Sequence, residues 1–141
     1  MEIISRAEKD TEGVAFNLAS QIRGGEVLAL QGDLGSGKTT FTKYFAKALG
    51  IKELVTSPTY VIMKSYDFSR NGQKLQLFHI DAYRLHEPSD AESVGLHEII
   101  GKAKTVTVVE WPEKIRPFVP LSARLIEFEY ISENCRKITI N

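Results

Sequence analysis

The sequence predicts an α/β protein built on a mainly parallel sheet, with helices on both faces and additional antiparallel hairpin strands. A short apolar run, VLAL at residues 27–30, leads directly into a glycine-rich segment and then a helical pattern. A second, β-branched run, TVTVV, occupies residues 105–109. Short apolar or β-branched runs of this kind are typical of parallel strands buried on both faces. With 141 residues in all, we expect a single domain over residues 1–141.

The N-terminal part predicts an edge strand followed by a helix. Residues 1–5 are short and apolar enough for the strand. Ser5 and Glu8 match the S-x-x-E capping box, so we expect a helix over about residues 6–23. Glu8 is a candidate contact for a nucleotide base. The alternative is an exposed first turn that is simply rich in charge.

Residues 32–39, GDLGSGKT, fit the phosphate-binding P-loop pattern G-x-x-x-x-G-K-[ST] and give the fold its P-loop NTPase-like character. The glycines let consecutive backbone N–H groups curl around a phosphate, and the N-terminus of the next helix attracts the same anion. In this pattern the lysine reaches the β and γ phosphates and the next hydroxyl binds magnesium. We therefore expect ATP or ADP with Mg²⁺ at Gly35, Ser36, Gly37, Lys38, Thr39 and Thr40.

The residues after the loop support this interpretation. Phe41, Phe45 and Leu49 recur every four residues, as the buried stripe of a helix does, and Gly50 is placed to end that helix. Beyond it, Thr59 lies in a proline-containing segment that is first of all a plain turn. The functional alternative is a switch loop whose Thr59 hydroxyl approaches the γ-phosphate or its magnesium.

Two strand-like segments, residues 60–68 and 74–80, flank Asn71-Gly72, the strongest short signal for a hairpin turn. Asp81 follows the second of them. Ligands bind at the carboxyl edge of open α/β sheets, so Asp81 is a candidate for handling magnesium or the attacking water. The alternative is that Asp81 caps a turn.

A second capping box, Ser89 with Glu92, predicts a short connecting helix that ends at Gly101. The run at residues 105–109 then predicts a central parallel strand, and Glu110 follows it as a second acid at a strand end. Trp111 is either a core or interface residue or a mobile part of the site beside Glu110.

The C-terminal part predicts a terminal hairpin, because apolar and charged residues alternate over residues 124–130 and 136–140. Arg136 is a candidate for stacking on a base, against the alternative of a solvated hairpin arginine. The three histidines have no metal-ligand spacing with one another or with Cys135, so we assign none of them a chemical role.

Composition excludes some classes of protein. Eighteen basic and eighteen acidic residues give a formal net charge of zero, so no global basic field holds the chain on nucleic acid. There is no apolar run of membrane-spanning length and no secretory leader pattern, which predicts a cytoplasmic protein without membrane association.

Three classes of nucleotide protein compete. A GTPase carries an N-K-x-D guanine signature, which this chain lacks. A small P-loop kinase usually has an arginine-rich lid that excludes water, and the arginines here are scattered. An ATPase, or a non-catalytic nucleotide-gated interaction module, remains.

Four motifs together are similar to one family. GDLGSGKTT at 32–40, SPTY at 57–60, HIDAYRL at 79–85 and VEWPEKI at 109–115 resemble, in order and spacing, the bacterial TsaE family, the ATPase of tRNA threonylcarbamoyladenosine biosynthesis. The P-loop alone is shared with many families, whereas the combination is specific. Ser36 stands where that family commonly has alanine, a change between small residues that leaves the loop intact.

The resemblance implies a function that depends on partners. TsaE proteins bind a TsaB and TsaD heterodimer, in which TsaD transfers the threonylcarbamoyl group to ANN-decoding tRNAs, and their ATP hydrolysis permits multiple turnover. The tRNA is then contacted indirectly, through the complex. By the same resemblance Thr39, Asp81 and Glu110 serve metal and water, Thr59 lies in a first switch and Trp111 in a second. The separate roles of the two acids do not follow from their spacing.

Overall fold

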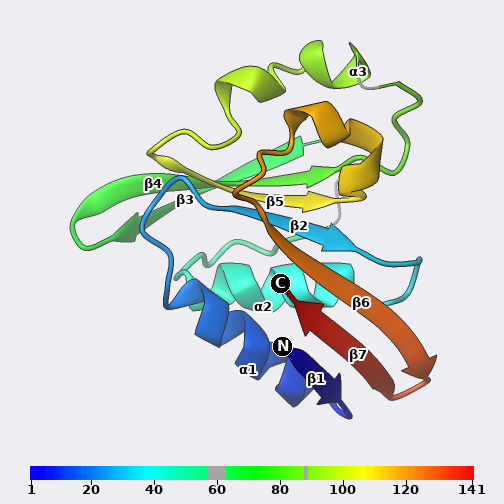
Figure 1. Ribbon diagram of the computed structural model, residues 1–141. Coiled ribbons are helices and arrows are strands. Elements are labelled where there is room, and N and C mark those ends of the chain that lie inside the picture. Colours follow the sequence, from blue (N-terminus) through cyan, green and yellow to red (C-terminus); the bar gives the residue numbers. More distant parts are fainter. Residues whose placement is uncertain (57–62, 88) are drawn as a thin grey trace.

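The computed structural model describes residues 1–56, 63–87 and 89–141. Its seven strands form one sheet in the order β1-β7-β6-β2-β5-β4-β3 (Figure 1). The strands are β1 (Glu2–Ser5), β2 (Val27–Gln31), β3 (Met63–Arg70), β4 (Gln73–Asp81), β5 (Thr105–Glu110), β6 (Arg124–Ser132) and β7 (Cys135–Ile140).

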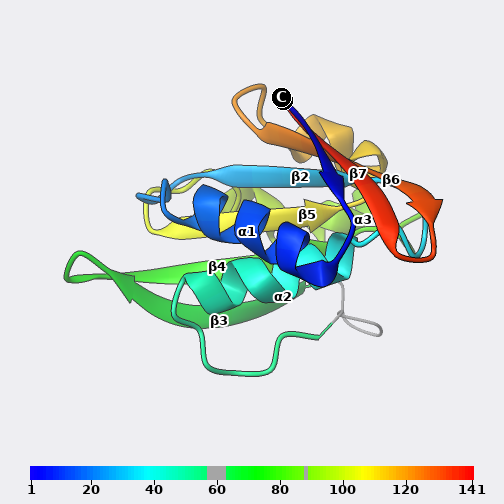
Figure 2. The ribbon, with the colours of Figure 1, turned by 90° about the horizontal axis from the view of Figure 1, so that it is seen from below.

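Helices lie on both faces of the sheet, as the sequence predicts. They are α1 (Glu8–Ala19), α2 (Lys38–Ala48), α3 (Ser89–Glu92) and the 3₁₀ helices η1 (Leu96–Glu98) and η2 (Pro112–Phe118). The two long helices, α1 and α2, pack side by side on one face, and the short ones lie on the other (Figures 1 and 2). None of the helices in the described residues is both long and apolar enough to cross a membrane.

The sheet is less parallel than the sequence predicts. The four central strands, β6, β2, β5 and β4, run parallel to one another, which gives three parallel pairs. The flanking pairs β1–β7, β7–β6 and β4–β3 are antiparallel, so the two kinds are equal in number. The reason is that hairpins extend the sheet at both sides. The prediction of a mainly parallel sheet holds only for its centre.

The central strands are buried because each of their faces meets a different apolar layer. On β2, Leu28 and Leu30 belong to the core beneath α1 and α2, whereas Val27 belongs to the smaller core on the opposite face. On β5, Val108 and Val109 divide in the same way. This two-sided burial explains why β2 is a continuous apolar run in the sequence and β5 a β-branched one.

Several predicted elements are confirmed. Asn71 and Gly72 both adopt positive φ, 51° and 79°, as a tight type I′ hairpin turn between β3 and β4 requires. The terminal hairpin is β6 and β7. Gly50 has φ of 92° just beyond α2, where the predicted helix end lies.

The predicted start of the first helix is wrong. Ser5 is the last residue of β1 rather than a helix cap, and its hydroxyl donates to the Ala7 carbonyl at 2.9 Å. The helix begins at Glu8 with Ala7 as its N-cap and ends at Ala19, so it is shorter than the predicted range 6–23. The strand continues to Ser5 because β1 pairs with β7 up to that residue.

The single short helix predicted from Ser89 to Gly101 is also not found. Only four residues from Ser89 are α-helical, and a separate 3₁₀ turn starts at Leu96. Gly95, between them, has φ of 76°, a left-handed conformation that interrupts the helix.

Candidate functional site

The glycine-rich loop, residues 32–37, connects the carboxyl end of β2 to the N-terminus of α2. Gly32 passes so close to β6 that an added Cβ would lie 2.5 Å from the Phe128 carbonyl oxygen. Gly37 is the N-cap of α2 and has φ of 107°. Beneath the loop, Phe41 of α2 packs edge-on against Phe128, with 5.6 Å between ring centroids. The strand, the loop and the helix therefore form one fixed unit, with the helix N-terminus at the sheet edge.

Lys38 lies in the first turn of α2 and is almost completely buried, with 5% of its surface exposed. Its ammonium group donates to the carbonyl oxygens of Gly32 and Asp33, the latter at 2.9 Å. It also lies 4.5 Å from the centre of the Trp111 ring, a cation–π contact. One lysine thus joins the loop to the opposite side of the site.

Burial and the neighbouring carboxylates shift the pKa of Lys38 in opposite directions. Burial lowers the pKa of its amine below the ordinary value of 10.5, while the nearby carboxylates of Glu110 and Asp81 raise it in part. A bound anion would add negative charge beside a cation that lies out of water. A phosphate group is therefore a suitable ligand for this lysine.

The opposite side of the site comes from the ends of β4 and β5. These strands are parallel, and their register places Asp81 directly beside Glu110. Glu110 is 3% exposed and is held at both oxygens. Its Oε1 accepts a hydrogen bond from the Thr39 hydroxyl at 3.2 Å, and its Oε2 lies 2.6 Å from Nε2 of His79.

Asp81 and Trp111 also face this space. Asp81 accepts a hydrogen bond from the backbone N–H of Tyr83 at 3.0 Å. It therefore caps a turn, which was the alternative considered for it, while it also lines this space. Trp111 adopts φ of 61°, a left-handed conformation, and its backbone N–H donates to the Leu30 carbonyl at 3.2 Å. Its half-buried ring lies 5.0 Å from the ring of Tyr83.

These groups enclose a pocket of about 250 Å³, which we call the strand-end pocket. Its lining residues are Leu34, Gly35, Gly37, Lys38, Thr39, Thr40, Asp81, Tyr83, Glu110, Trp111 and Arg136. The fold therefore gathers both predicted acids, most of the predicted loop residues and Trp111 around one space. It brings together segments that are more than a hundred residues apart in the chain.

The oxygen atoms in the strand-end pocket fit a magnesium ion that is shared with phosphates. Thr39 and Glu110 offer hard oxygen ligands at adjacent positions, with Asp81 next to them. Among the described residues there is no group of three or more His, Cys, Asp or Glu side chains placed to hold a metal. Mg²⁺ commonly takes one or two protein carboxylates and completes its shell with phosphate oxygens and water.

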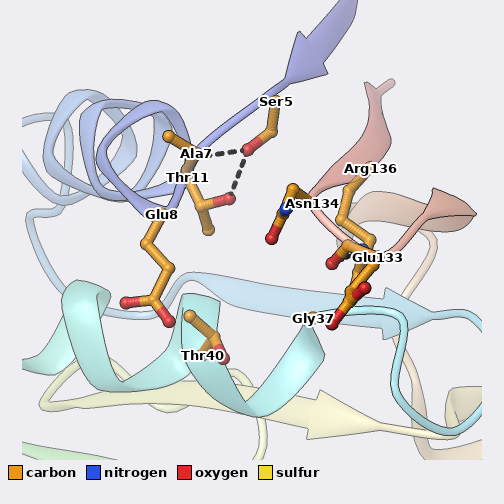
Figure 3. Close-up of a pocket in the computed structure, with 9 residues that line it drawn as sticks. All are labelled: Ser5, Ala7, Glu8, Thr11, Gly37, Thr40, Glu133, Asn134 and Arg136. Carbon is orange, nitrogen blue, oxygen red and sulfur yellow. Dashed lines mark hydrogen bonds between the residues drawn. The ribbon is translucent and has the colours of Figure 1, made fainter.

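A second, smaller pocket of about 170 Å³ adjoins the first and shares Gly37, Thr40 and Arg136 with it. We call it the hairpin pocket, because the β6–β7 hairpin closes one side (Figure 3). Glu8 lies on its other side, where the carboxylate accepts a hydrogen bond from the Tyr44 hydroxyl at 2.8 Å. The two predicted base-contacting residues, Glu8 and Arg136, thus line the same pocket.

Arg136 differs from a freely solvated hairpin arginine, the alternative considered for it. Its guanidinium donates to the carbonyls of Ser132, Glu133 and Cys135, and lies 4.5 Å from the centre of the Tyr130 ring. These contacts hold the guanidinium between the hairpin and both pockets.

Ser36, a predicted site residue, is not part of these pockets. The Ser36 hydroxyl is 1% exposed, lines neither pocket and has no hydrogen-bond partner among the described residues. It lies beneath the loop, 2.7 Å from where a Cβ on Gly32 would be. Thr59 and the rest of the SPTY motif lie outside the described residues.

His79 is the site residue that the sequence interpretation missed. The absence of metal-ligand spacing led us to assign it no chemical role, but it is fully buried against Glu110. A signal was present: His79 precedes Asp81 by two residues on one strand, and such residues face the same side of a sheet. Tyr83 and Leu34, which line the strand-end pocket, gave no comparable signal.

Comparison with known proteins gives consistent results. A family model described as "Threonylcarbamoyl adenosine biosynthesis protein TsaE" matches residues 5–138. A Bacillus subtilis protein named tRNA threonylcarbamoyladenosine biosynthesis protein TsaE is 40% identical over 131 residues, covering 93% of this chain and 78% of the relative. An Aquifex aeolicus protein of the same name is 36% identical over 141 residues, covering 99% and 94%.

The fold has a similar solved counterpart. The crystal structure of Bacillus subtilis YdiB superposes with a TM-score of 0.75 at 32% sequence identity. The superposition covers 99% of this chain and 83% of that chain.

Proposed function

The chain belongs to the TsaE family of tRNA threonylcarbamoyladenosine biosynthesis proteins, and from that premise we propose that it is the subunit that binds and hydrolyses ATP in this modification. The observation that carries the proposal is the strand-end pocket. A loop and helix N-terminus suited to phosphate face two carboxylates from neighbouring strand ends across one space.

The loop side supplies most of the ground-state affinity in this proposal. Backbone N–H groups at the start of α2, together with Lys38, bind the β and γ phosphates of ATP. To do so, the Lys38 ammonium exchanges its contacts with the Gly32 and Asp33 carbonyls for phosphate oxygens. Thr39 and Glu110 would hold Mg²⁺, which would supply neutralisation of the phosphate charge.

The strand-end side supplies the hydrolytic chemistry. Asp81 and Glu110 are the groups available to orient an attacking water, and Trp111 with Tyr83 limits access of bulk solvent from one side. A carboxylate that orients water acts mainly in the transition state. We therefore assign turnover, rather than affinity, to this side of the pocket.

The hairpin pocket is the proposed base site. It adjoins the strand-end pocket and is lined by Thr40, Glu8 and Arg136. The chain lacks the guanine signature N-K-x-D, which favours adenine. Guanine nucleotides should accordingly displace labelled ADP poorly. Displacement by GDP at the same concentration as by ADP would contradict this assignment.

The proposed partners are the TsaB and TsaD subunits, with tRNA reached through the complex. A chain with zero formal net charge gives no electrostatic support for independent RNA binding. The pocket is formed by separate strand ends and loops, and such a site can depend on a partner for its final geometry. The isolated protein should then bind ATP readily and hydrolyse it slowly.

The deciding experiment measures phosphate release from ATP by the purified protein alone, with TsaB and TsaD, and with tRNA added. Binding is measured in parallel from the fluorescence of Trp111, the single tryptophan in the chain. The proposal expects nucleotide binding in every mixture and a marked rise in turnover with the heterodimer. A fast enzyme indifferent to the heterodimer would favour the kinase alternative, which transfer of the γ-phosphoryl group to an acceptor would identify. Binding without hydrolysis in any mixture would favour a non-catalytic nucleotide-gated module.

A further inference from the structure

His79 is a fully buried polar residue that no step described above uses. It lies on β4, with Lys64 of β3 and Val108 of β5 as its cross-strand neighbours, and its ring is 0% exposed. Burying an imidazole in the interior of a sheet is unfavourable unless its nitrogen atoms find partners. Nε2 has a partner, Oε2 of Glu110 at 2.6 Å, whereas Nδ1 has none among the described residues.

These contacts indicate which nitrogen of the His79 ring carries the hydrogen. A carboxylate accepts hydrogen bonds, so Nε2 carries the hydrogen and donates it to Glu110. Since Nδ1 has no partner in the described part of the chain, the orientation of the ring depends on packing and on this single hydrogen bond. Within the described part of the chain the ring thus has one polar contact, and that contact is an acid of the strand-end pocket.

The effect on Glu110 is a restraint on both of its oxygens. Oε2 is held by His79 from within the sheet, and Oε1 is held by Thr39 from the first turn of α2. A rotation of the carboxylate breaks both contacts. Metal-binding side chains commonly depend on such outer partners, and loss of one typically lowers metal affinity or activity 10–100-fold.

We propose that His79 is a positioning residue that fixes the Glu110 carboxylate so that Oε1 faces Thr39 and the strand-end pocket. His79 touches neither nucleotide nor metal in this scheme and acts only through Glu110. The inference rests on the proposed function, because it concerns the use of Glu110 in holding Mg²⁺ with the nucleotide.

The test compares two amides that differ by one methylene. In His79→Gln the amide nitrogen takes roughly the place of Nε2 and can still donate to Glu110. In His79→Asn it takes roughly the place of Nδ1 and falls short. Thr107→Val is the matched control, since Thr107 is likewise fully buried on the adjacent strand β5 but has no hydrogen-bond partner for its hydroxyl among the described residues.

The first readout is Mn²⁺ binding to the ADP complex, followed by electron paramagnetic resonance, beside ADP affinity without metal. We expect His79→Asn to weaken Mn²⁺ binding by about 10–100-fold. The fold-loss in His79→Gln should be less than about a quarter of the fold-loss in His79→Asn. ADP affinity without metal stays within about threefold in both variants, on the scale where tenfold is 1.4 kcal/mol. Where hydrolysis is measured, kcat should fall in His79→Asn by a larger factor than KM for ATP rises.

The outcomes separate this inference from the proposed function. Equal Mn²⁺ binding in wild type, His79→Asn and His79→Gln overturns the positioning role, as does an equal loss in both variants. A wild-type protein that binds neither ADP nor Mn²⁺-ADP overturns the proposed function instead. If circular dichroism shows that His79→Asn is unfolded, His79→Leu takes its place, because leucine also lacks the donor and fills the buried position. Thr107→Val should behave as wild type throughout.

Discussion

The two sides of the strand-end pocket are built in different ways. The loop side, from β2 through the glycine-rich loop into α2, is one continuous segment, held by short-range contacts such as Lys38 with the carbonyls of Gly32 and Asp33. The strand-end side consists of Asp81 and Glu110, which meet only because β4 and β5 pair in parallel. A contiguous motif can therefore be recognised from the sequence, whereas an assembled one depends on the register of the sheet.

The difference also suggests a division of labour. The loop side offers a cation and helix N–H groups, which attract phosphate in the ground state. The strand-end side offers carboxylates, which repel phosphate but can place a metal or a water. If the two sides act separately, substitutions on each should change different measured quantities.

The largest effect is expected on the strand-end side. Glu110→Ala should lower kcat for ATP hydrolysis by about 10²–10³-fold, the scale of loss when a group that stabilises the transition state is removed. ADP affinity measured without metal should stay within about threefold, because the loop side is intact. Steady-state phosphate release and a binding titration measure the two quantities. Glu127→Ala removes an exposed carboxylate of β6 and serves as the control.

Lys38→Ala should show the converse. Loss of the ammonium removes charge-assisted hydrogen bonds to phosphate, each worth about 1.5–3 kcal/mol, so ADP affinity should fall by about tenfold to a hundredfold. Isothermal titration calorimetry gives the affinity directly. Lys47→Ala, an exposed lysine in the last turn of the same helix, should bind ADP as wild type does. Unchanged ADP affinity in Lys38→Ala would contradict the proposal that the loop side binds the phosphates.

The sequence predicted the two sides unequally for physical reasons. The loop motif, the stripe of Phe41 and Phe45 and the hairpin turn at Asn71 are set by local backbone and packing requirements, and all three are found as expected. Asp81 and Glu110 were recognised at strand ends, but that β4 and β5 are neighbours depends on the strand order.

Other features were not accessible to sequence patterns. The pairing of His79 with Glu110 requires that same register, and metal-ligand spacing gave no indication of it. The Ser5 capping box was wrong because pairing of β1 with β7 outweighs a local capping preference. The mainly parallel sheet was an overstatement because each hairpin adds an antiparallel pair at the side of the sheet.

A smaller effect is expected on protein stability when two glycines of the loop are compared. Gly32 and Gly35 both adopt positive φ, but only at Gly32 would an added Cβ meet backbone, at 2.5 Å from the Phe128 oxygen. Gly32→Ala should therefore lower the free energy of unfolding by about 1–3 kcal/mol more than Gly35→Ala, since overpacking against backbone adds to the strain of φ. Urea denaturation of the two variants measures this difference. Equal destabilisation would mean that β6 yields to the added methyl group.

The smallest effect concerns pH. Protonated Lys38 attracts phosphate, and burial lowers the pKa of its amine in the free protein below 10.5, whereas bound phosphate raises it. ADP affinity should thus be complete below the free-protein pKa and decline as the pH rises through it, before an ordinary lysine would lose its proton. A titration series at alkaline pH measures the decline. Lys38→Arg, whose guanidinium stays charged, should show no such decline whatever its affinity.

The most direct test of separate roles is a single-turnover measurement in which protein exceeds ATP and its concentration is raised until all ATP is bound. The account predicts that Lys38→Ala needs far more protein to reach saturation than wild type does. Glu110→Ala should need much less extra protein than Lys38→Ala to reach saturation, and should then hydrolyse its bound ATP about a hundredfold more slowly or worse. The contrary result is a Glu110→Ala protein that either hydrolyses bound ATP at the wild-type rate or loses affinity as severely as Lys38→Ala.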